Sequence, residues 1–185
     1  MLRRHAPLVR FFAILVGVYA VWFVLYDLWL LPDGRLDAWL SHRVATASAG
    51  LLGLIGFDVV HAGRVLGLDG AAGVEVADGC NGLTTVGLFI GFVLAFPGQW
   101  QRRMWFIPMG IGLLLLVNVL RVASLAIIQV EWPEAFASVH SFGATTFFYV
   151  VVFILWVVWA NLGNSSSSPV TPSAALEGAD QGVVA

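Results

Sequence analysis

The 185-residue chain contains no lysine and only one cysteine, Cys80. A single cysteine excludes an internal disulfide and argues against a cysteine-based metal cage. The nine basic residues are all arginines and form no module of the kind that binds nucleic acid. Motifs of serine hydrolases, zinc proteases and phosphate-binding loops are also absent. The sequence therefore predicts no metal, no cofactor and no nucleic-acid partner.

Apolar residues, in contrast, are abundant. Hydrophobic residues make up 59% of it and charged residues 11%, and the mean hydropathy is +0.90, values typical of an integral membrane protein. A helix needs ~20 apolar residues to cross a bilayer. Four runs come close to or exceed this length, at about residues 8–30, 79–97, 105–130 and 140–162. The sequence thus predicts an all-α membrane protein with a single transmembrane domain, residues 1–162, of four transmembrane helices.

The segment between the first two spans, residues 31–78, has a different character. Its helical part, residues 36–57, contains an apolar stretch that is short for a span and rich in small residues. We therefore favour an interfacial or re-entrant helix here, with a true span over 44–57 as the alternative. Further along, the alternation of residues 65–76 around Asp69-Gly70 predicts a short β-hairpin on the membrane face.

Arginines in the short loops predict the orientation, because basic residues stay on the cytoplasmic side. We therefore predict a cell (inner) membrane protein with cytoplasmic N- and C-termini and an extracytoplasmic segment 31–78. The Ser-, Pro- and Gly-rich residues 163–185 are predicted to form a disordered cytoplasmic tail. With four spans, the side with more arginines holds Arg3, Arg4, Arg10, Arg102 and Arg103, and the other holds Arg35, Arg43 and Arg64.

Cys80 lies where the polar segment meets the second apolar run, at the predicted outer mouth of that span. Asp78 is a candidate N-cap, and the unpaired N–H groups of a first helical turn favour a thiolate over a thiol. Cys80 is therefore a candidate nucleophile, with a buried, inert thiol as the alternative. Thr84 follows one turn later on the same helix face and is a candidate lining residue.

Arg121 is the one charged residue within the third apolar run, and such a charge costs at least ~2.5 kcal/mol on insertion scales. Asn118 and Ser124 share its helix face. Arg121 is either a hydrogen-bonded clamp between helices or a cation that stabilises an oxyanion or binds a carboxylate. His140 begins the fourth span on the same predicted side, where it is either a surface histidine or a proton-transfer partner for Cys80.

In order and spacing, these residues resemble the exosortase/archaeosortase family of membrane transpeptidases over about residues 65–160. The ordered set of a cysteine, an Asn-x-x-Arg pair and a histidine in a multi-span protein carries the resemblance. The chain departs from many members by having Asn81 where they have serine, and from larger members by having fewer helices. The matching pieces are Cys80-Asn81-Gly82-Leu83, Phe96-Pro97, Asn118-Val119-Leu120-Arg121-Val122 and His140.

The resemblance implies that Cys80 is the nucleophile, His140 the proton-transfer partner and Arg121 the stabiliser of the tetrahedral intermediate. Asn118 would support Arg121, and Asn81 would be a further supporting residue. It also implies exported protein substrates with a C-terminal sorting segment, cleaved through an acyl-enzyme and passed to an unknown acceptor. The main alternative is a non-enzymatic membrane assembly subunit in which Arg121 and Asn118 hold helices together. A small transporter is disfavoured, because internal repeats and intramembrane acids are absent.

Overall fold

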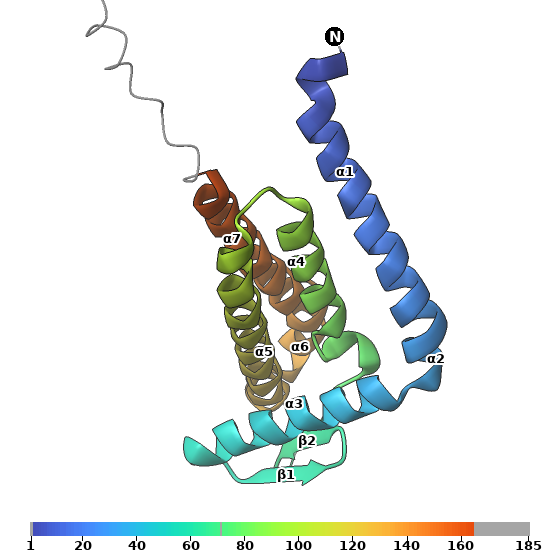
Figure 1. Ribbon diagram of the computed structural model, residues 1–185. Helices are drawn as coiled ribbons and strands as arrows, with labels where there is room; N and C mark the ends of the chain where they lie inside the picture. The colour runs from blue at the N-terminus through green and yellow to red at the C-terminus, as the bar shows by residue number, and fades with distance from the viewer. Residues whose placement is uncertain (1, 71, 165–185) are drawn as a thin grey trace, which may run out of the picture.

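The computed structural model describes residues 2–70 and 72–164, which form a mostly helical protein with one small sheet (Figure 1). The tail predicted to be disordered, residues 163–185, lies outside the described residues, except that Gly163 and Asn164 end the last helix. The helical elements are α1 (Leu2–Trp22), the π-helical η1 (Phe23–Leu30), α2 (Leu31–Asp33), α3 (Arg35–Leu54), the 3-10 turn η2 (Asp78–Cys80), α4 (Leu83–Ala95), α5 (Trp100–Glu131), α6 (Pro133–Ser138), the π-helical η3 (Val139–Gly143) and α7 (Ala144–Asn164).

Within the described residues, three stretches of helix are long and apolar enough to cross a membrane. They correspond to the first, third and fourth predicted spans. Successive elements join to make them, because the chain stays helical through Pro32 in the first and through η3 in the last. The three stretches are Leu8–Asp33, Trp100–Glu131 and Pro133–Gly163.

The second predicted span, residues 79–97, is shorter than expected. The helix there, α4, has 13 residues, which at ~1.5 Å per residue is less than the ~30 Å hydrocarbon core. It begins late because Gly82 adopts a left-handed conformation with φ of 87°, and it ends because Phe96 is extended ahead of a proline. The predicted count of four transmembrane helices is therefore not confirmed.

Helix α3 runs crosswise to α4, α5 and α7 at one end of the bundle (Figure 1). Its buried side chains recur every three or four residues, so that one face packs on the protein and the other is exposed. This arrangement favours the interfacial interpretation of residues 36–57 over a true span. The buried residues are Asp37, Ser41, Val44, Ala45, Ser48 and Leu52.

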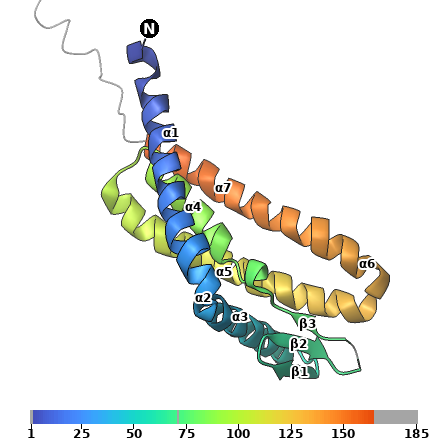
Figure 2. The same ribbon diagram turned by 90° about the vertical axis from the view of Figure 1, so that its right-hand side faces the viewer.

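The β-hairpin predicted over residues 65–76 is present as β2 (Val65–Leu68) and β3 (Val74–Glu75). The two strands pair antiparallel, with Leu66 opposite Val74. A further strand, β1 (Val59–Ala62), pairs antiparallel with β2 and gives a sheet of order β1-β2-β3, which the sequence did not predict. Figure 2 shows the sheet at the same end of the molecule as α3.

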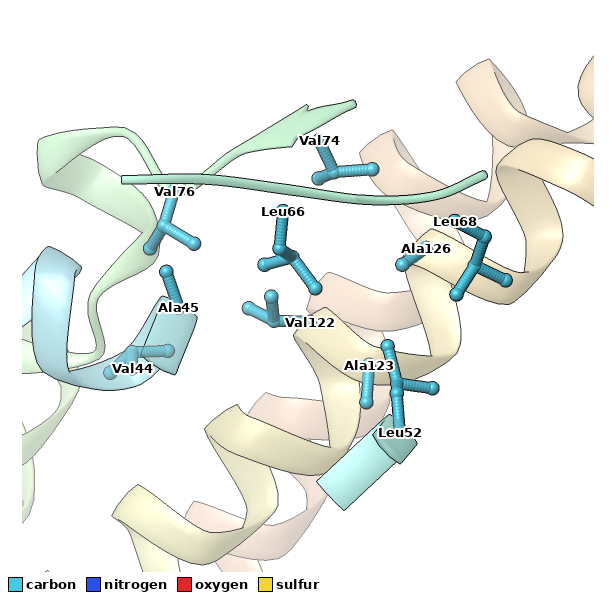
Figure 3. Packing of buried hydrophobic residues seen from close by; sticks show 10 residues of the cluster. All are labelled: Val44, Ala45, Leu52, Leu66, Leu68, Val74, Val76, Val122, Ala123 and Ala126. Atoms are coloured by element: carbon cyan, nitrogen blue, oxygen red, sulfur yellow. The ribbon is translucent and has the colours of Figure 1, made fainter. Parts of the chain in front are cut away.

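Buried apolar side chains form two clusters. The first joins α3, the sheet and the second half of α5 (Figure 3). The second joins α4, the first half of α5 and α7. The first consists of Val44, Ala45, Leu52, Leu66, Leu68, Val74, Val76, Val122, Ala123 and Ala126, and the second of Val86, Phe89, Val93, Phe106, Leu114, Val117, Phe148, Val152, Leu155 and Trp159.

Two glycines on α5 give a matched test of the second cluster. A Cβ added at Gly110 would lie 2.2 Å from the buried Phe89 ring, whereas one at Gly112 would meet no atom within 4 Å. We predict that Gly110→Ala lowers stability by about 1–3 kcal/mol relative to Gly112→Ala, because both gain helix propensity but only the first overpacks the core. Thermal unfolding of the purified variants in detergent measures the difference, and equal midpoints would contradict this packing.

Candidate functional site

Cys80 ends the 3-10 turn η2, which links β3 to α4. The Cys80 N–H donates to the carbonyl of Ala77 at 2.8 Å, and Gly82 then starts α4 at Leu83. Cys80 therefore precedes the helix rather than lying in its first turn. The prediction that Asp78 caps this helix is wrong, because Gly82 occupies the N-cap position and makes no side-chain capping bond.

The carboxylate of Asp78 instead pairs with the guanidinium of Arg64. Arg64 also pairs with Glu75 at 3.2 Å, and its carbonyl accepts a hydrogen bond from the Val76 N–H at 2.9 Å. One arginine, in the turn between β1 and β2, thus binds a carboxylate on each side of residues 76 and 77. These contacts fix the approach of the chain to Cys80.

Asn81, next to Cys80, anchors the turn from the other side. Its side chain is only 1% exposed, and its Oδ1 accepts from the Leu83 N–H at 2.9 Å. Its Nδ2 donates to Oδ1 of Asp37 on α3 at 2.6 Å, and the Tyr26 hydroxyl donates to the same oxygen at 2.9 Å. The buried carboxylate therefore ties the first span, α3 and the cysteine turn together.

Asp37 and Tyr26 are residues that the sequence analysis missed. The pattern that marks Asp37 is the apolar and small-residue period of α3, in which Asp37 and Ser41 occupy the same face as Val44 and Ser48. An acid on the buried face of an amphipathic helix requires polar partners, because an unpaired buried carboxylate is costly. This periodicity indicates burial but does not identify the partners.

Asn118 and Arg121, one turn apart on α5, both bind the main chain of Cys80. Asn118 Nδ2 donates to the Cys80 carbonyl oxygen at 3.0 Å, and Arg121 Nη2 donates to the same oxygen at 2.9 Å. Gly82 permits this approach, since a Cβ there would lie 3.3 Å from Asn118 Nδ2. These hydrogen bonds thus join the cysteine turn to the Asn-x-x-Arg pair, which lies some forty residues further along the chain.

The guanidinium of Arg121 keeps hydrogen-bonding capacity beyond this contact. It lies 5.4 Å from the centre of the Phe148 ring on α7, and its Nε is buried without a partner among the residues described. Cys80 itself is half-buried and packs against the first apolar cluster. A fixed cation therefore lies beside the residue that carries the thiol.

His140 lies in η3, a π-helical turn between α6 and α7, with its ring stacked on Phe136 at 5.7 Å. Its side chain is exposed. Arg121 lines a cavity of about 240 Å³ together with Val139 and Gly143 of the same turn. The structure thus places the His140 segment across a cavity from Arg121, and π-helical turns are frequent at functional sites.

Thr84 lies beside Tyr26, with which it shares a hydrogen bond, and not at the contact of Cys80 with Arg121. It lines a cavity of about 100 Å³ between α1 and α4, together with Trp22 and Gly87. Among the described residues, no group of three or more His, Cys, Asp or Glu side chains gathers as a metal site would require. Of the predicted site residues, the structure therefore brings together Cys80 with its neighbour Asn81, and Asn118 with Arg121, although the two pairs are far apart in the sequence.

A family model described as Transmembrane exosortase matches residues 4–157, a range that includes Cys80, Asn118, Arg121 and His140. No curated protein and no solved structure matches the chain. The match covers most of the sequence, including the turn that carries Cys80 and the helix that binds it.

Exchanging the two groups of the Asp37–Asn81 pair tests its importance. We predict that Asn81→Asp destabilises the protein by about 3 kcal/mol, because it sets two carboxylates against each other in a buried place. Adding Asp37→Asn should restore most of the loss, since the amide can then donate to the carboxylate while Tyr26 and the Leu83 N–H keep oxygen acceptors. Thermal unfolding of both single variants and the double variant measures this, and a double variant no more stable than Asn81→Asp would contradict the network.

Proposed function

We propose, because this chain belongs to the transmembrane exosortase family, that it is a membrane cysteine peptidase or transpeptidase acting on exported proteins that carry a C-terminal sorting segment. The observation that carries the proposal is the pair of hydrogen bonds from Asn118 and Arg121 to the Cys80 carbonyl. They hold a permanent cation beside a cysteine at the end of an apolar bundle. The family match and the hydrogen bonds that hold the guanidinium against the main chain of Cys80 therefore support the same chemistry.

In the proposed reaction, the Cys80 thiol gives its proton to His140 and the sulfur attacks the carbonyl carbon of the scissile peptide bond. A C–S bond forms and the carbonyl oxygen becomes an oxyanion. Collapse of this intermediate breaks the C–N bond, and the leaving amine takes the proton from His140. Water or an acceptor amine then attacks the thioester, which releases the product and restores the thiol.

Arg121 stabilises the oxyanion in this scheme. A guanidinium has five N–H donors, of which the Cys80 carbonyl uses one, and the buried Nε has no partner among the residues described. The Cys80 carbonyl and the Phe148 ring fix the orientation of the group before substrate arrives. Preorganised donors of this kind supply a large part of the stabilisation in acyl transfer.

His140 supplies proton transfer from η3. The chain reverses direction at Trp132, between α5 and α6. Arg121 before this reversal and His140 after it therefore lie at a similar distance from the end of the bundle. Arg121 lines a cavity with Val139 and Gly143, which flank His140 in η3, whereas Cys80 and His140 do not line it. In the proposed reaction the substrate peptide enters this cavity and brings its scissile bond to Cys80 and His140. Asn118 and Asn81 act by positioning the turn, and Thr84 contacts the region of α1.

The proposed orientation places the site on the extracytoplasmic face of the cell membrane with both termini in the cytoplasm. Arg102 and Arg103 support it, because they lie at the end of α5 remote from Cys80. The hairpin and α3 lie at the Cys80 end (Figure 1). An exported substrate would then reach Cys80 from the extracytoplasmic face of the membrane.

A non-enzymatic assembly subunit is the second candidate function. The observation that favours it is that Asn118 and Arg121 bind main chain rather than the thiol, which is also what a structural clamp would do. Cys80 packs against apolar side chains, as an inert thiol would. The two candidates differ in whether the sulfur and the guanidinium geometry are needed for processing.

The sulfur is tested by Cys80→Ala in cells that express a C-terminally tagged exported substrate. We predict that the full-length substrate accumulates and the processed form disappears, because no other cysteine exists to form the acyl-enzyme. Immunoblotting of substrate and of the variant protein measures both processing and expression. Normal processing with Cys80→Ala would leave the assembly subunit as the function.

The guanidinium geometry is tested by Arg121→Lys, with Arg43→Lys as the control. Arg43 is an exposed arginine over the Trp39 ring on α3, so the control makes the same change outside the site. We predict that Arg121→Lys lowers kcat for peptide cleavage by about 10²-fold or more, since an ammonium cannot bind Cys80 and still offer a planar set of donors to the oxyanion. Cleavage at close to the control rate would mean that only the charge is needed.

A further inference from the structure

A large cavity lies at the end of the bundle remote from the sheet and from Cys80. It has a volume of about 570 Å³, within the range of ~300–1,000 Å³ that small-ligand sites occupy. Elements from three parts of the chain form its wall: α1, the end of α4 with the loop that follows, and the start of α5. The lining residues are Arg10, Phe11, Ile14, Leu94, Ala95, Pro97, Gly98 and Arg103.

Two arginines in this wall lack a countercharge from the protein. Among the described residues, neither Arg10 nor Arg103 has an ion-pair partner. On the first span the nearest carboxylate in sequence, Asp27, is about 25 Å from Arg10 at the helical rise of ~1.5 Å per residue. The elements α2, α3, the sheet and α6, which carry other acidic residues, lie toward the other end of the bundle (Figure 1). Among the residues that the structure describes, no carboxylate therefore neutralises the positive charge of the cavity.

Arg103 is held in position for such a ligand. Its Nη2 donates to the carbonyl of Phe96 at 3.0 Å, and its Nε is buried with no partner among the residues described. A buried donor without a partner is costly, and an acceptor from outside the protein removes that cost. A guanidinium so fixed suits a phosphate, whose oxygens accept paired hydrogen bonds.

The rest of the wall is apolar, which a free anion would not use. Phe11 meets the rings of Phe92 and Phe96 edge-on, with centroids 6.0 and 6.1 Å away, and closes one side of the cavity. Ile14 and Leu94 line it further toward the middle of the bundle. The ligand that fits both halves is an amphiphile with an anionic head and an apolar tail.

From this combination we propose that the cavity binds one anionic phospholipid, with its phosphate between Arg10 and Arg103 and its acyl chains along Phe11, Ile14 and Leu94. The lipid bridges α1 to the rest of the bundle. The first span needs such support, since none of its most apolar window is buried within the protein. Basic pockets between membrane helices are known to bind lipid head groups in this way. The site is separate from the chemistry proposed for Cys80, so either assignment can fail without the other.

The test is native mass spectrometry of the full chain purified in neutral detergent. Equal concentrations of phosphatidylglycerol and phosphatidylcholine with identical acyl chains are offered, and retained lipid is counted per protein. We expect one phosphatidylglycerol to be retained at least about tenfold more strongly than phosphatidylcholine, the factor that ~1.4 kcal/mol gives. Arg103→Gln and Arg10→Gln should each lower its retention by a similar factor.

Arg102→Gln is the matched control. It removes the same charge from the neighbouring position, but Arg102 bonds to the carbonyl of Leu162 and lines a different cavity. Retention should stay at the wild-type level with Arg102→Gln and largely recover with Arg103→Lys. If Arg103→Gln does not fold, Arg10→Gln decides the outcome, because Arg10 is exposed on α1.

Three results would overturn the proposal. The two lipids could be retained equally, in which case the arginines do not select the head group. Arg102→Gln could weaken retention as much as Arg103→Gln and Arg10→Gln, which would reflect general surface charge. Glycerol 3-phosphate could displace phosphatidylglycerol at equal concentration, which would make the cavity a site for free anions and leave the apolar wall without a role.

Discussion

The backbone carbonyl of Cys80 accepts two hydrogen bonds from α5, and the arrangement of the site depends on them. A charge placed in an apolar helix is costly unless it meets a polar partner, and this carbonyl is the partner of Arg121. Asn118 uses the same acceptor from one turn away. The two hydrogen bonds fix the cysteine turn against a long helix. The position of Cys80, which lies outside the helices, is therefore set by α5.

The surrounding fold keeps that turn in place from its other sides. Arg64 holds the chain before it through Glu75 and Asp78, and Asp37 holds it from α3 through Asn81. Beneath these polar contacts, the apolar cluster of Figure 3 packs α3 and the sheet against α5. The small sheet and the crosswise helix therefore act as a platform for the cysteine turn. At the opposite end of the bundle, Arg10 and Arg103 line a cavity and have no ion-pair partner within the described part of the chain.

Much of this could be predicted from the sequence. Long apolar runs predicted four spans, of which three are helices long enough to cross a membrane among the described residues. Alternation around Asp69-Gly70 predicted the hairpin, and the cost of burying Arg121 indicated a polar partner. The late start of α4 could not be read in this way, because apolar content does not reveal that Gly82 adopts a left-handed conformation. Hydropathy counts residues 79–82 as helix, whereas backbone conformation removes them from it.

The partners within the site were harder to predict than its members. The spacing of Asn118 and Arg121 places both on one helix face, but it cannot show that their common acceptor is a main-chain carbonyl. The period of α3 places Asp37 on its buried face, but it cannot show that Asn81 and Tyr26 are the partners of the carboxylate. Pairings between residues far apart in the chain depend on how whole elements dock, which local periodicity does not encode.

The proposed function requires that the cysteine turn and the His140 segment face one shared site. Because Cys80 is the only cysteine, His140→Cys creates a chain with two thiols, and a short bifunctional thiol reagent can report their proximity by intact mass. The account predicts efficient intramolecular cross-linking in this variant and little in Val157→Cys, a control on an exposed position of α7 about 25 Å further along the helix. Cross-linking of His140→Cys no greater than that of the control would contradict a common site.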